Sequence, residues 1–302
     1  MIGKIDYETA QATLRGNRNS NQDRSIVLTS PEGSVLLLLA DGLGGHPGGE
    51  IAATILMETA KHLFVQTEKP IPDPDRFLSA LLHAAHLDIV DYGQSQEPAM
   101  EPRTTAVAAL VQHGRVYWAH VGDSRFYLLR QGKILSRTED HSMVQRMQKQ
   151  GLISWEEAGH HPQRNLVTRA LGGRPSRVTV DHGPSAGLRN NDIILLCSDG
   201  LWGQIGHATL GRILGDTRTP LDRLTRILAH RAEAQAFPES DNVTVATLRW
   251  LGDDAEDADR LPTGEGDENA MPQEPPGYQQ ADDPYRPQNT DSPTSNREND
   301  TR

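Results

Sequence analysis

Four aspartates in this 302-residue chain stand at turns, each next to a strand-like segment. They are Asp41 in ADGLGG, Asp123 in HVGDSR, Asp199 in CSDGLW and Asp241 in ESDNVT, with Asp23 in NQDRS as a fifth candidate. A single aspartate at a turn is usually a turn former, because its side chain mimics backbone hydrogen bonds. Asp41 and Asp199, however, each end a long apolar run, where a carboxylate is costly to desolvate unless it is paired or binds a cation. Two such strand ends favour a shared metal site.

The candidate ligands are all oxygen donors, since the chain has one cysteine, Cys197, and no HExxH motif. Such ligands indicate Mg²⁺ or Mn²⁺ and not zinc. Several carboxylates at one site suggest two ions about 3.5–4 Å apart, an arrangement suited to displacement at phosphorus. Arg18, five residues before Asp23, is the best-placed cation for a phosphate group, because guanidinium binds phosphate oxygens bidentately. The alternative for Arg18 is a solvated loop charge.

The segment around Asp41 predicts a strand, a tight turn and a helix. Residues 35–40, VLLLLA, form an apolar run that ends at Asp41, and a helical pattern extends from about Gly49 to Gln66. This arrangement can cradle a phosphate-bearing cofactor at a helix N-terminus or hold a carboxylate against a hard metal ion. The predicted inner face of the helix contains Ile51, Ile55, Leu56 and Leu63.

The other elements are predicted from periodicity and capping residues. Short strands are expected at residues 7–13 and 24–29, and a second helix begins with Asp73 as N-cap and Pro74 at the first helical position. The predicted inner face of this second helix contains Leu78, Leu82, Ala85 and Ile89. From Thr104 four strand-like runs follow, with connections too short for parallel crossovers, and they predict an antiparallel meander.

The second half of the chain returns to strands after a polar helical stretch at 142–172. Strands are predicted at 177–182, 192–198 and 242–249, with a helix before the last one that is capped by Thr219 and Pro220. The inner face of this helix is expected to contain Leu221, Leu224, Ile227 and Leu228. The fold class is therefore α+β, with two stacked antiparallel sheets covered on the outside by helices.

The negative charge is concentrated in the last fifty residues. Fourteen acids and four basic residues give residues 251–302 a net charge of −10, which leaves about −1 of the total −11 for residues 1–250. This tail has seven prolines and almost no aliphatic residues, so it cannot bury enough surface to offset its ordering entropy. We expect a catalytic domain at 1–250 and a disordered tail at 251–302 that is a solubilising extension or an interaction segment.

Composition also limits localisation and partners. The nearly neutral body gives no electrostatic case for nucleic acid. The N-terminus MIGKIDYETA has no apolar core flanked by cations, and no apolar run approaches the ~20 residues of a membrane span. The single cysteine excludes an intramolecular disulfide and agrees with a reducing compartment. We expect a soluble, cytoplasmic protein without membrane or nucleic-acid partners, and a monomer.

Nine short motifs occur in the order found in one enzyme family. They are RNSNQD at 18–23 of the pattern R-x-x-N-x-D, DGLGGH at 41–46, GEIA at 49–52, TTA at 104–106, HVGDSR at 120–125, EDHS at 139–142, NLVTRALG at 165–172, CSDGL at 197–201 and SDNVT at 240–244. Over roughly residues 5–250 the chain thus resembles the bacterial metal-dependent protein phosphatases of the protein phosphatase 2C family. Single motifs are weak signals, and nine in order are a strong one.

The resemblance implies a function and a role for each matched residue. It implies hydrolysis of phosphoserine and phosphothreonine on proteins, a β-sandwich of two antiparallel sheets flanked by helix pairs, and a bacterial Ser/Thr kinase as the opposing partner. Asp41 is similar to the ligand that bridges two Mn²⁺ or Mg²⁺ ions, with the carbonyl of Gly42 completing one coordination shell. By the same resemblance, Asp199 and Asp241 are similar to the other carboxylate ligands, and Asp123 is similar to the ligand of a third, weaker metal. Asp23 is similar to an acid that supports the site, and Arg18 to the arginine that binds the substrate phosphate.

Two residues depart from the family pattern. Gln22 stands where many members have Glu, from which we expect altered metal affinity without loss of activity. Leu43 stands where eukaryotic members have a histidine proposed as general acid, so protonation of the leaving group is unassigned. His46 or a metal-bound water could serve, and His46 could equally be an ordinary loop histidine. Residues 151–172 resemble the family's flap beside the active site, and there His160 and His161 are expected at the surface.

Three alternative functions fit the sequence less well. A dinucleotide-binding enzyme is disfavoured because, counted from Gly42, the third glycine of G-x-G-x-x-G would fall on Pro47. A cysteine-dependent phosphatase would need an arginine six residues after Cys197, where Gly203 stands. Cys197 is therefore read as a small buried hydrophobe. The non-enzymatic alternative is a catalytically weak, phosphatase-like module that binds phosphoproteins, but such a protein should have lost metal-binding acids, and all the expected ones are present.

Overall fold

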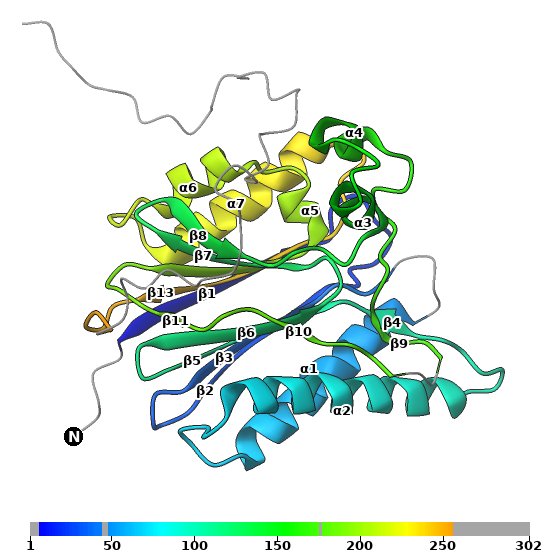
Figure 1. The fold of residues 1–302 in the computed structure, drawn as a ribbon, viewed down its shortest axis with the longest axis horizontal. Coiled ribbons are helices and arrows are strands. Elements are labelled where there is room, and N and C mark those ends of the chain that lie inside the picture. Colours follow the sequence, from blue (N-terminus) through cyan, green and yellow to red (C-terminus); the bar gives the residue numbers. More distant parts are fainter. Residues whose placement is uncertain (1–5, 44–47, 175–176, 256–302) are drawn as a thin grey trace, which may run out of the picture.

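Two antiparallel sheets form the centre of the molecule (Figure 1). The structure is a computed structural model and describes residues 6–43, 48–174 and 177–255. The first sheet has the order β1 (Tyr7–Leu14), β13 (Val243–Trp250), β12 (Ile193–Cys197), β7 (Arg125–Arg130) and β8 (Lys133–Arg137). The second has the order β10 (Asp181–His182), β6 (Arg115–Val121), β5 (Ala106–Gln112), β3 (Val35–Ala40) and β2 (Arg24–Thr29), with β11 (Ala186–Gly187) also paired to β6.

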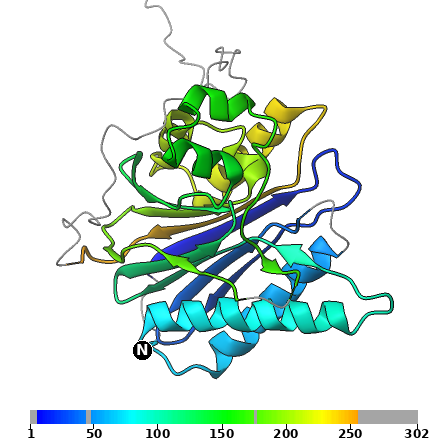
Figure 2. The same cartoon turned by 45° about the vertical axis from the view of Figure 1, so that its right-hand side comes forward.

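Helices cover the outer face of each sheet (Figures 1 and 2). Helices α1 (Gly49–Gln66) and α2 (Pro74–Gln94) pack on the second sheet. Helices α5 (Asp199–Trp202), α6 (His207–Leu214) and α7 (Leu221–Ala236) lie over the first. The short helices α3 (Met143–Lys149) and α4 (Trp155–His160) stand at one end of the sandwich. The α+β fold with stacked antiparallel sheets is as predicted.

Strand β3 has both faces buried, which explains its uniformly apolar sequence. Leu36, Leu38 and Ala40 belong to the core against α1 and α2, and the alternate residues face the other sheet. All six residues of β3 are fully buried. Between the sheets the Trp118 and Phe126 rings stack with centroids 4.3 Å apart. Each fully buried large apolar side chain stabilises the folded state by about 1.5–3 kcal/mol. The packing of this layer therefore fixes the position at which β3 ends and the chain continues into Asp41.

The predicted four-stranded meander is wrong at one connection. Strands β5 and β6 form one hairpin in the second sheet, whereas β7 and β8 form another in the first. The chain crosses between the sheets at the turn of Gly122 and Asp123, where Gly122 has a φ of 113°. A Cβ at position 122 would lie 2.6 Å from the side chain of Thr105, so glycine is needed there. The crossing places Asp123 at the end of the sandwich, beside the end of β3.

Other elements differ from the predictions in detail. The buried face of α1 is centred on Ala52, Leu56 and Ala60. Of its predicted inner face, Leu56 is buried, whereas Ile51, Ile55 and Leu63 are only half-buried. The inner face of α2 is as predicted, and Asp73 accepts a hydrogen bond from the Arg76 N–H as its N-cap. The predicted strand at 177–182 is reduced to β10, and helices α5 and α6 were not predicted.

The residues that follow β13 contact the body of the protein. Residues 251–255 pack on the body, since the Ala255 N–H donates to the Leu188 carbonyl (2.9 Å) and Trp250 Nε1 donates to the Asp253 carbonyl (3.1 Å). Of the predicted tail at 251–302, residues 256–302 lie outside the described residues. Within the part of the chain that the structure describes, no helix combines the length and apolar character needed to span a bilayer.

Candidate metal centre and active site

The backbone of Asp41 is fixed by two fully buried threonines. The Asp41 N–H donates to Thr105 Oγ1 (3.0 Å), and the Asp41 carbonyl accepts from the Thr105 N–H (2.8 Å) and from Thr104 Oγ1 (2.9 Å). These bonds satisfy the backbone polar groups at the point where β3 ends. The position from which the Asp41 carboxylate projects is therefore set by its neighbours in the fold.

The turn after Asp41 packs backbone against backbone. A Cβ at Gly42 would lie 2.5 Å from the carbonyl of Gly49 and 2.8 Å from that of Gln22, so only glycine fits. The Gly42 N–H donates to the Gln22 carbonyl (3.3 Å), and the Leu43 N–H donates to the Arg103 carbonyl (3.0 Å). The turn is thereby held between the start of α1, the segment before β2 and the short strand β4 (Arg103–Thr104).

Asp23 connects the two sheets. Its side chain is buried at the start of β2, and its Oδ2 accepts from Ser198 Oγ (2.8 Å). Ser198, at the end of β12, in turn accepts from the Thr244 N–H of β13 (3.0 Å). Asp23 thus lies beside the strand end that carries Asp199.

Asp241 and Arg18 meet at the rim of the site. Arg18 Nη2 lies 2.6 Å from Asp241 Oδ2, and the two side chains are 56% and 36% exposed. Asn242 holds the loop that carries Arg18. Its Oδ1 accepts from the Gln22 N–H (2.8 Å), and its Nδ2 donates to the carbonyls of Arg15 (2.7 Å) and Ser20 (3.0 Å). Arg18 is therefore both anchored through its loop and accessible to solvent.

The five aspartates form one electrostatic cluster. Burial raises the pKa of Asp41 well above its usual range, and the charges of the four other aspartates raise it further. Burial likewise raises the pKa of Asp23 to about 7 and, with the charge of Asp241, that of Asp199 to about 6. The carboxyl groups of Asp199 and Asp41 lie close enough to interact directly. Sequence positions 23 to 241 are thus brought together at one end of the sandwich.

Asp123 lies on the turn where the chain changes sheet. It is 3% exposed, and burial together with the charge of Asp199 raises its pKa. Its carbonyl accepts from Trp202 Nε1 (2.9 Å). Asp123 is thereby the fifth member of the cluster. Its sequence signal was a turn in HVGDSR, whereas Asp41 and Asp199 each end a long apolar run.

The turn of Asp123 is also bonded to His141. The Gly122 N–H donates to His141 Nδ1 (3.0 Å), and the His141 N–H donates to the Gly122 carbonyl (2.9 Å). Because Nδ1 is an acceptor, Nε2 carries the proton and donates to Asp181 Oδ2 (3.0 Å). The other oxygen of this carboxylate, Asp181 Oδ1, accepts from Arg169 (2.7 Å). Burial and the stacked ring of His120 lower the pKa of His141 to about 4, so it is neutral.

The cluster has the chemistry of a site for hard divalent cations. Its side-chain donors are carboxylate oxygens, and burial together with the charges of neighbouring aspartates raises the pKa values of Asp23, Asp41, Asp123 and Asp199. A bound cation would reverse these shifts. Among the described residues, no three His, Cys, Asp or Glu side chains are arranged so that they already enclose an ion. The residue types and their proximity therefore fit the predicted Mn²⁺ or Mg²⁺ centre, and ligand assignments residue by residue remain predictions.

Other predicted features lie where expected or outside the described part. Cys197 is fully buried, and burial raises the pKa of its thiol to about 12, which suits a structural residue. His160 is exposed at the end of α4, as expected, whereas His161 is half-buried. His46, a candidate general acid, lies outside the described residues.

Sequence reasoning assigned no role to several residues that build the site. Thr104, Thr105, Ser198 and Asn242 all fall inside the recognised motifs, yet their backbone-directed hydrogen bonds depend on segments far away in the chain. Their position directly beside the predicted acids was the available signal. Small polar residues next to a buried acid are candidates for orienting it.

Comparison with known proteins supports one family. The family model described as protein phosphatase 2C matches residues 11–239 of this chain. The chain is 32% identical over 236 residues to the serine/threonine phosphatase stp of Listeria innocua, a match that covers 77% of this chain and 92% of that protein.

Solved structures give the same result. The serine/threonine phosphatase Stp1 of Staphylococcus aureus matches with a TM-score of 0.74 and 30% identity, covering 81% of this chain and 95% of that one. The catalytic domain of the serine threonine protein phosphatase PstP, in complex with two manganese ions, matches with a TM-score of 0.67 and 32% identity over 82% of this chain and 99% of that one.

Proposed function

The chain belongs to the protein phosphatase 2C family, and from this premise we propose how its own residues carry out the reaction. It is a metal-dependent protein serine/threonine phosphatase with a dinuclear Mn²⁺ or Mg²⁺ site. The observation that carries the assignment of residues is the convergence of five aspartates, from five segments of the chain, around the end of β3.

The proposed ligands are the acids of this cluster. Asp41, Asp199 and Asp241 hold the two ions together with the carbonyl of Gly42, and Asp123 belongs to a third site. Asp23 supports the others through its bond to Ser198. When bound, such ions polarise the phosphoryl oxygens and lower the pKa of a water that becomes the nucleophile.

Arg18 is proposed to bind the phosphate group of the substrate. Its guanidinium is exposed at the rim of the cluster and is paired with Asp241, so a phosphate can approach it from solvent. Hydrolysis is direct, without a phosphoenzyme. This is supported by Cys197, which is fully buried with a raised thiol pKa and has Gly203 where a cysteine phosphatase would have arginine.

The substrates are proposed to be proteins that carry phosphoserine or phosphothreonine. By family resemblance, a bacterial Ser/Thr kinase would supply these substrates and be one of them. We further propose that the protein acts in the cytoplasm, as a monomer, with residues 1–250 as its catalytic domain and residues 150–172 as a flap. The nearly neutral body gives no surface reason to expect nucleic acid.

The experiment is a metal-dependent assay on p-nitrophenyl phosphate and on a phosphothreonine peptide. Wild-type protein should be active with Mn²⁺ and inactive with EDTA, and Asp41→Ala and Asp199→Ala should be inactive with Mn²⁺. Circular dichroism of each variant controls for folding. Full activity in EDTA, or in either variant, would contradict the proposal.

A further inference from the structure

A groove lined by four arginines opens beside the turn that follows Asp41. Its volume is ≈ 290 Å³, and the arginines are Arg103, Arg169, Arg174 and Arg177. Among the described residues that line it, none is acidic. Two threonines, Thr168 and Thr179, add hydroxyl groups to the wall. Such a lining favours an anion over any other class of ligand.

The groove is joined to the proposed active site through β4. The Arg103 carbonyl accepts from the Leu43 N–H (3.0 Å), and the next residue, Thr104, donates to the Asp41 carbonyl (2.9 Å). Strand β4 pairs with β9 (Leu171–Gly172), which places the segments of Arg103 and Arg174 side by side. Figure 1 shows this pair of short strands at the end of the sandwich where α1 begins.

Carboxylates outside the groove hold three of the guanidinium groups in place. Glu101 accepts from Arg103 Nη2 (2.7 Å) and from Arg174 Nε (3.1 Å), and both contacts lower the pKa of Glu101, so it stays charged. Asp181 holds Arg169 (2.7 Å). Since each guanidinium has five N–H donors, these contacts leave donors for a ligand.

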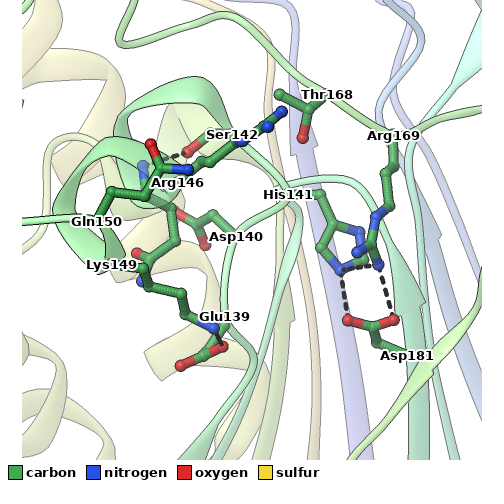
Figure 3. Close-up of a pocket in the computed structure, with 11 residues that line it drawn as sticks. Glu139, Asp140, His141, Ser142, Arg146, Lys149, Gln150, Thr168, Arg169 and Asp181 are labelled. Carbon is green, nitrogen blue, oxygen red and sulfur yellow. Dashed lines mark hydrogen bonds and ion pairs between the residues drawn. The ribbon is translucent and has the colours of Figure 1, made fainter.

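A neighbouring groove provides a comparison within the same region (Figure 3). It has a volume of ≈ 490 Å³ and shares Thr168 and Arg169 with the four-arginine groove. Its lining mixes Arg146 and Lys149 with Glu139, Asp140 and Asp181. Because its charges are balanced, it gives no comparable preference for an anion. The basic character is confined to the side that begins at Arg103.

We propose that the four-arginine groove binds a second anionic group of the phosphoprotein substrate, on a side chain a few residues away from the phosphorylated residue that is hydrolysed. Guanidinium groups bind carboxylate and phosphate oxygens bidentately, so the group is an acidic residue or a second phosphorylated residue. The substrate class is then an acidic or multiply phosphorylated segment. This inference rests on the proposed function of the Asp41 cluster.

The test compares three phosphothreonine peptides of equal length. One has neutral flanking residues, one has two flanking glutamates, and one has a second phosphate as a non-hydrolysable phosphonate. The full-length wild-type protein with Mn²⁺ should show a kcat/KM about tenfold higher for both anionic peptides than for the neutral one, mainly through KM. The ratio should decrease as salt rises from about 0.05 to 0.5 M. A preference for only one anionic peptide identifies which group the groove takes.

The decisive variant is Arg174→Ala combined with Arg177→Ala, because both side chains are exposed. It should reduce the ratio to less than about twofold. Because the result is a ratio between peptides, a change at the catalytic centre cancels. Arg223→Ala, an exposed arginine on α7, is the matched control and should keep the wild-type ratio. A wild-type ratio near one, or an unchanged ratio in the double variant, would overturn the proposal.

Failure of the proposed function can be told apart from failure of the groove. If the wild-type protein hydrolyses none of the peptides, the function is wrong, and fluorescence anisotropy of the same peptides on Asp41→Asn still measures binding to the arginines. Equal affinities for all three peptides there would overturn the inference. A preference that emerges only after deletion of residues 256–302 would assign the groove to that acidic segment and would also overturn it.

Discussion

Two groups of aspartates in this protein have opposite surroundings. Asp192 and Asp140 are buried, and each is held bidentately by an arginine. Arg130 lies 2.9 and 2.7 Å from the two Asp192 oxygens, and Arg125 lies 2.7 and 2.6 Å from those of Asp140. Within the cluster at the end of β3, the five aspartates face one another, and among the described contacts their arginine partner is the exposed Arg18.

The difference teaches how the fold treats the cost of burying a carboxylate. In the first group the compensating cation is part of the chain, so the pair is complete in the folded protein. In the second group, burial and the neighbouring carboxylates raise the pKa values of Asp41 and Asp23, and the missing positive charge must come from a ligand. The same residue type is therefore structural in one region and functional in the other.

The largest expected effect is on activity, from a change in the second group. Asp41→Asn should lower kcat/KM on p-nitrophenyl phosphate by about 10³-fold, because several kcal/mol of transition-state stabilisation depend on the ions it holds. Thermal unfolding in EDTA should not become easier, since asparagine keeps the size of the side chain and is uncharged without having to take up a proton on folding. Loss of activity together with a large loss of stability would instead place Asp41 in the structural group.

The next largest effect is on stability, from a change in the first group. Asp192→Asn keeps the side-chain size but removes the charge opposite Arg130, and it should lower the free energy of unfolding by about 3 kcal/mol. Chemical denaturation measures this value. The kcat of the folded fraction should stay close to that of the wild type, because Asp192 precedes β12, at the opposite end of this strand from Asp199. A kcat loss as large as that of Asp41→Asn would remove the distinction between the groups.

A smaller effect is expected from metal removal at different pH values. Asp23, with a pKa of about 7, and Asp41, with a raised pKa, bind protons in the folded metal-free protein that they release on unfolding, where their pKa is near 3.8. Stability in EDTA should therefore decrease as the pH rises from about 5.5 to 7, the range in which Asp23 loses its proton in the folded protein, by about 1–2 kcal/mol.

Saturating Mn²⁺ should abolish this trend, because the carboxylates are then charged and paired in the folded state. The buried histidines contribute equally with EDTA and with Mn²⁺, since His141 and His207 have pKa values lowered to about 4 by burial and are neutral in the folded protein. Thermal melts across the pH range, with EDTA and with Mn²⁺, measure both trends. A slope that is the same in EDTA and in Mn²⁺ would show that the cluster does not control it.

The smallest effect concerns the link between the cluster and the Asp181 side. His141→Gln can keep a donor towards Asp181 but loses the acceptor for the Gly122 N–H, whereas His141→Asn keeps that acceptor and loses the contact with Asp181. Leaving the Gly122 N–H unpaired should cost about 1 kcal/mol more in His141→Gln than in His141→Asn. The Mn²⁺ concentration needed for half-maximal activity should also rise more in His141→Gln than in His141→Asn, and a metal titration measures this concentration. The reverse order would show that Asp181 matters more than the turn of Asp123.

The sequence was sufficient for most elements and for the identity of the acids. Strand β3 and helix α1 have the predicted boundaries, because an unbroken apolar run and a helical period are local signals. The error at Gly122 has a different origin. A two-residue connection is compatible with a hairpin or with a crossing between sheets, and the choice depends on the packing of Trp118 against Phe126 and of Gly122 against Thr105.

What the sequence determined by itself is the set of groups: strand ends with carboxylates, a glycine turn, an arginine before Asp23 and an acidic segment at the C-terminus. The tertiary structure alone decided which carboxylates face one another, which are paired with arginine, and that four arginines line one groove. The physical reason is that electrostatic energy depends on distance and burial, and both arise from contacts between segments up to about two hundred residues apart.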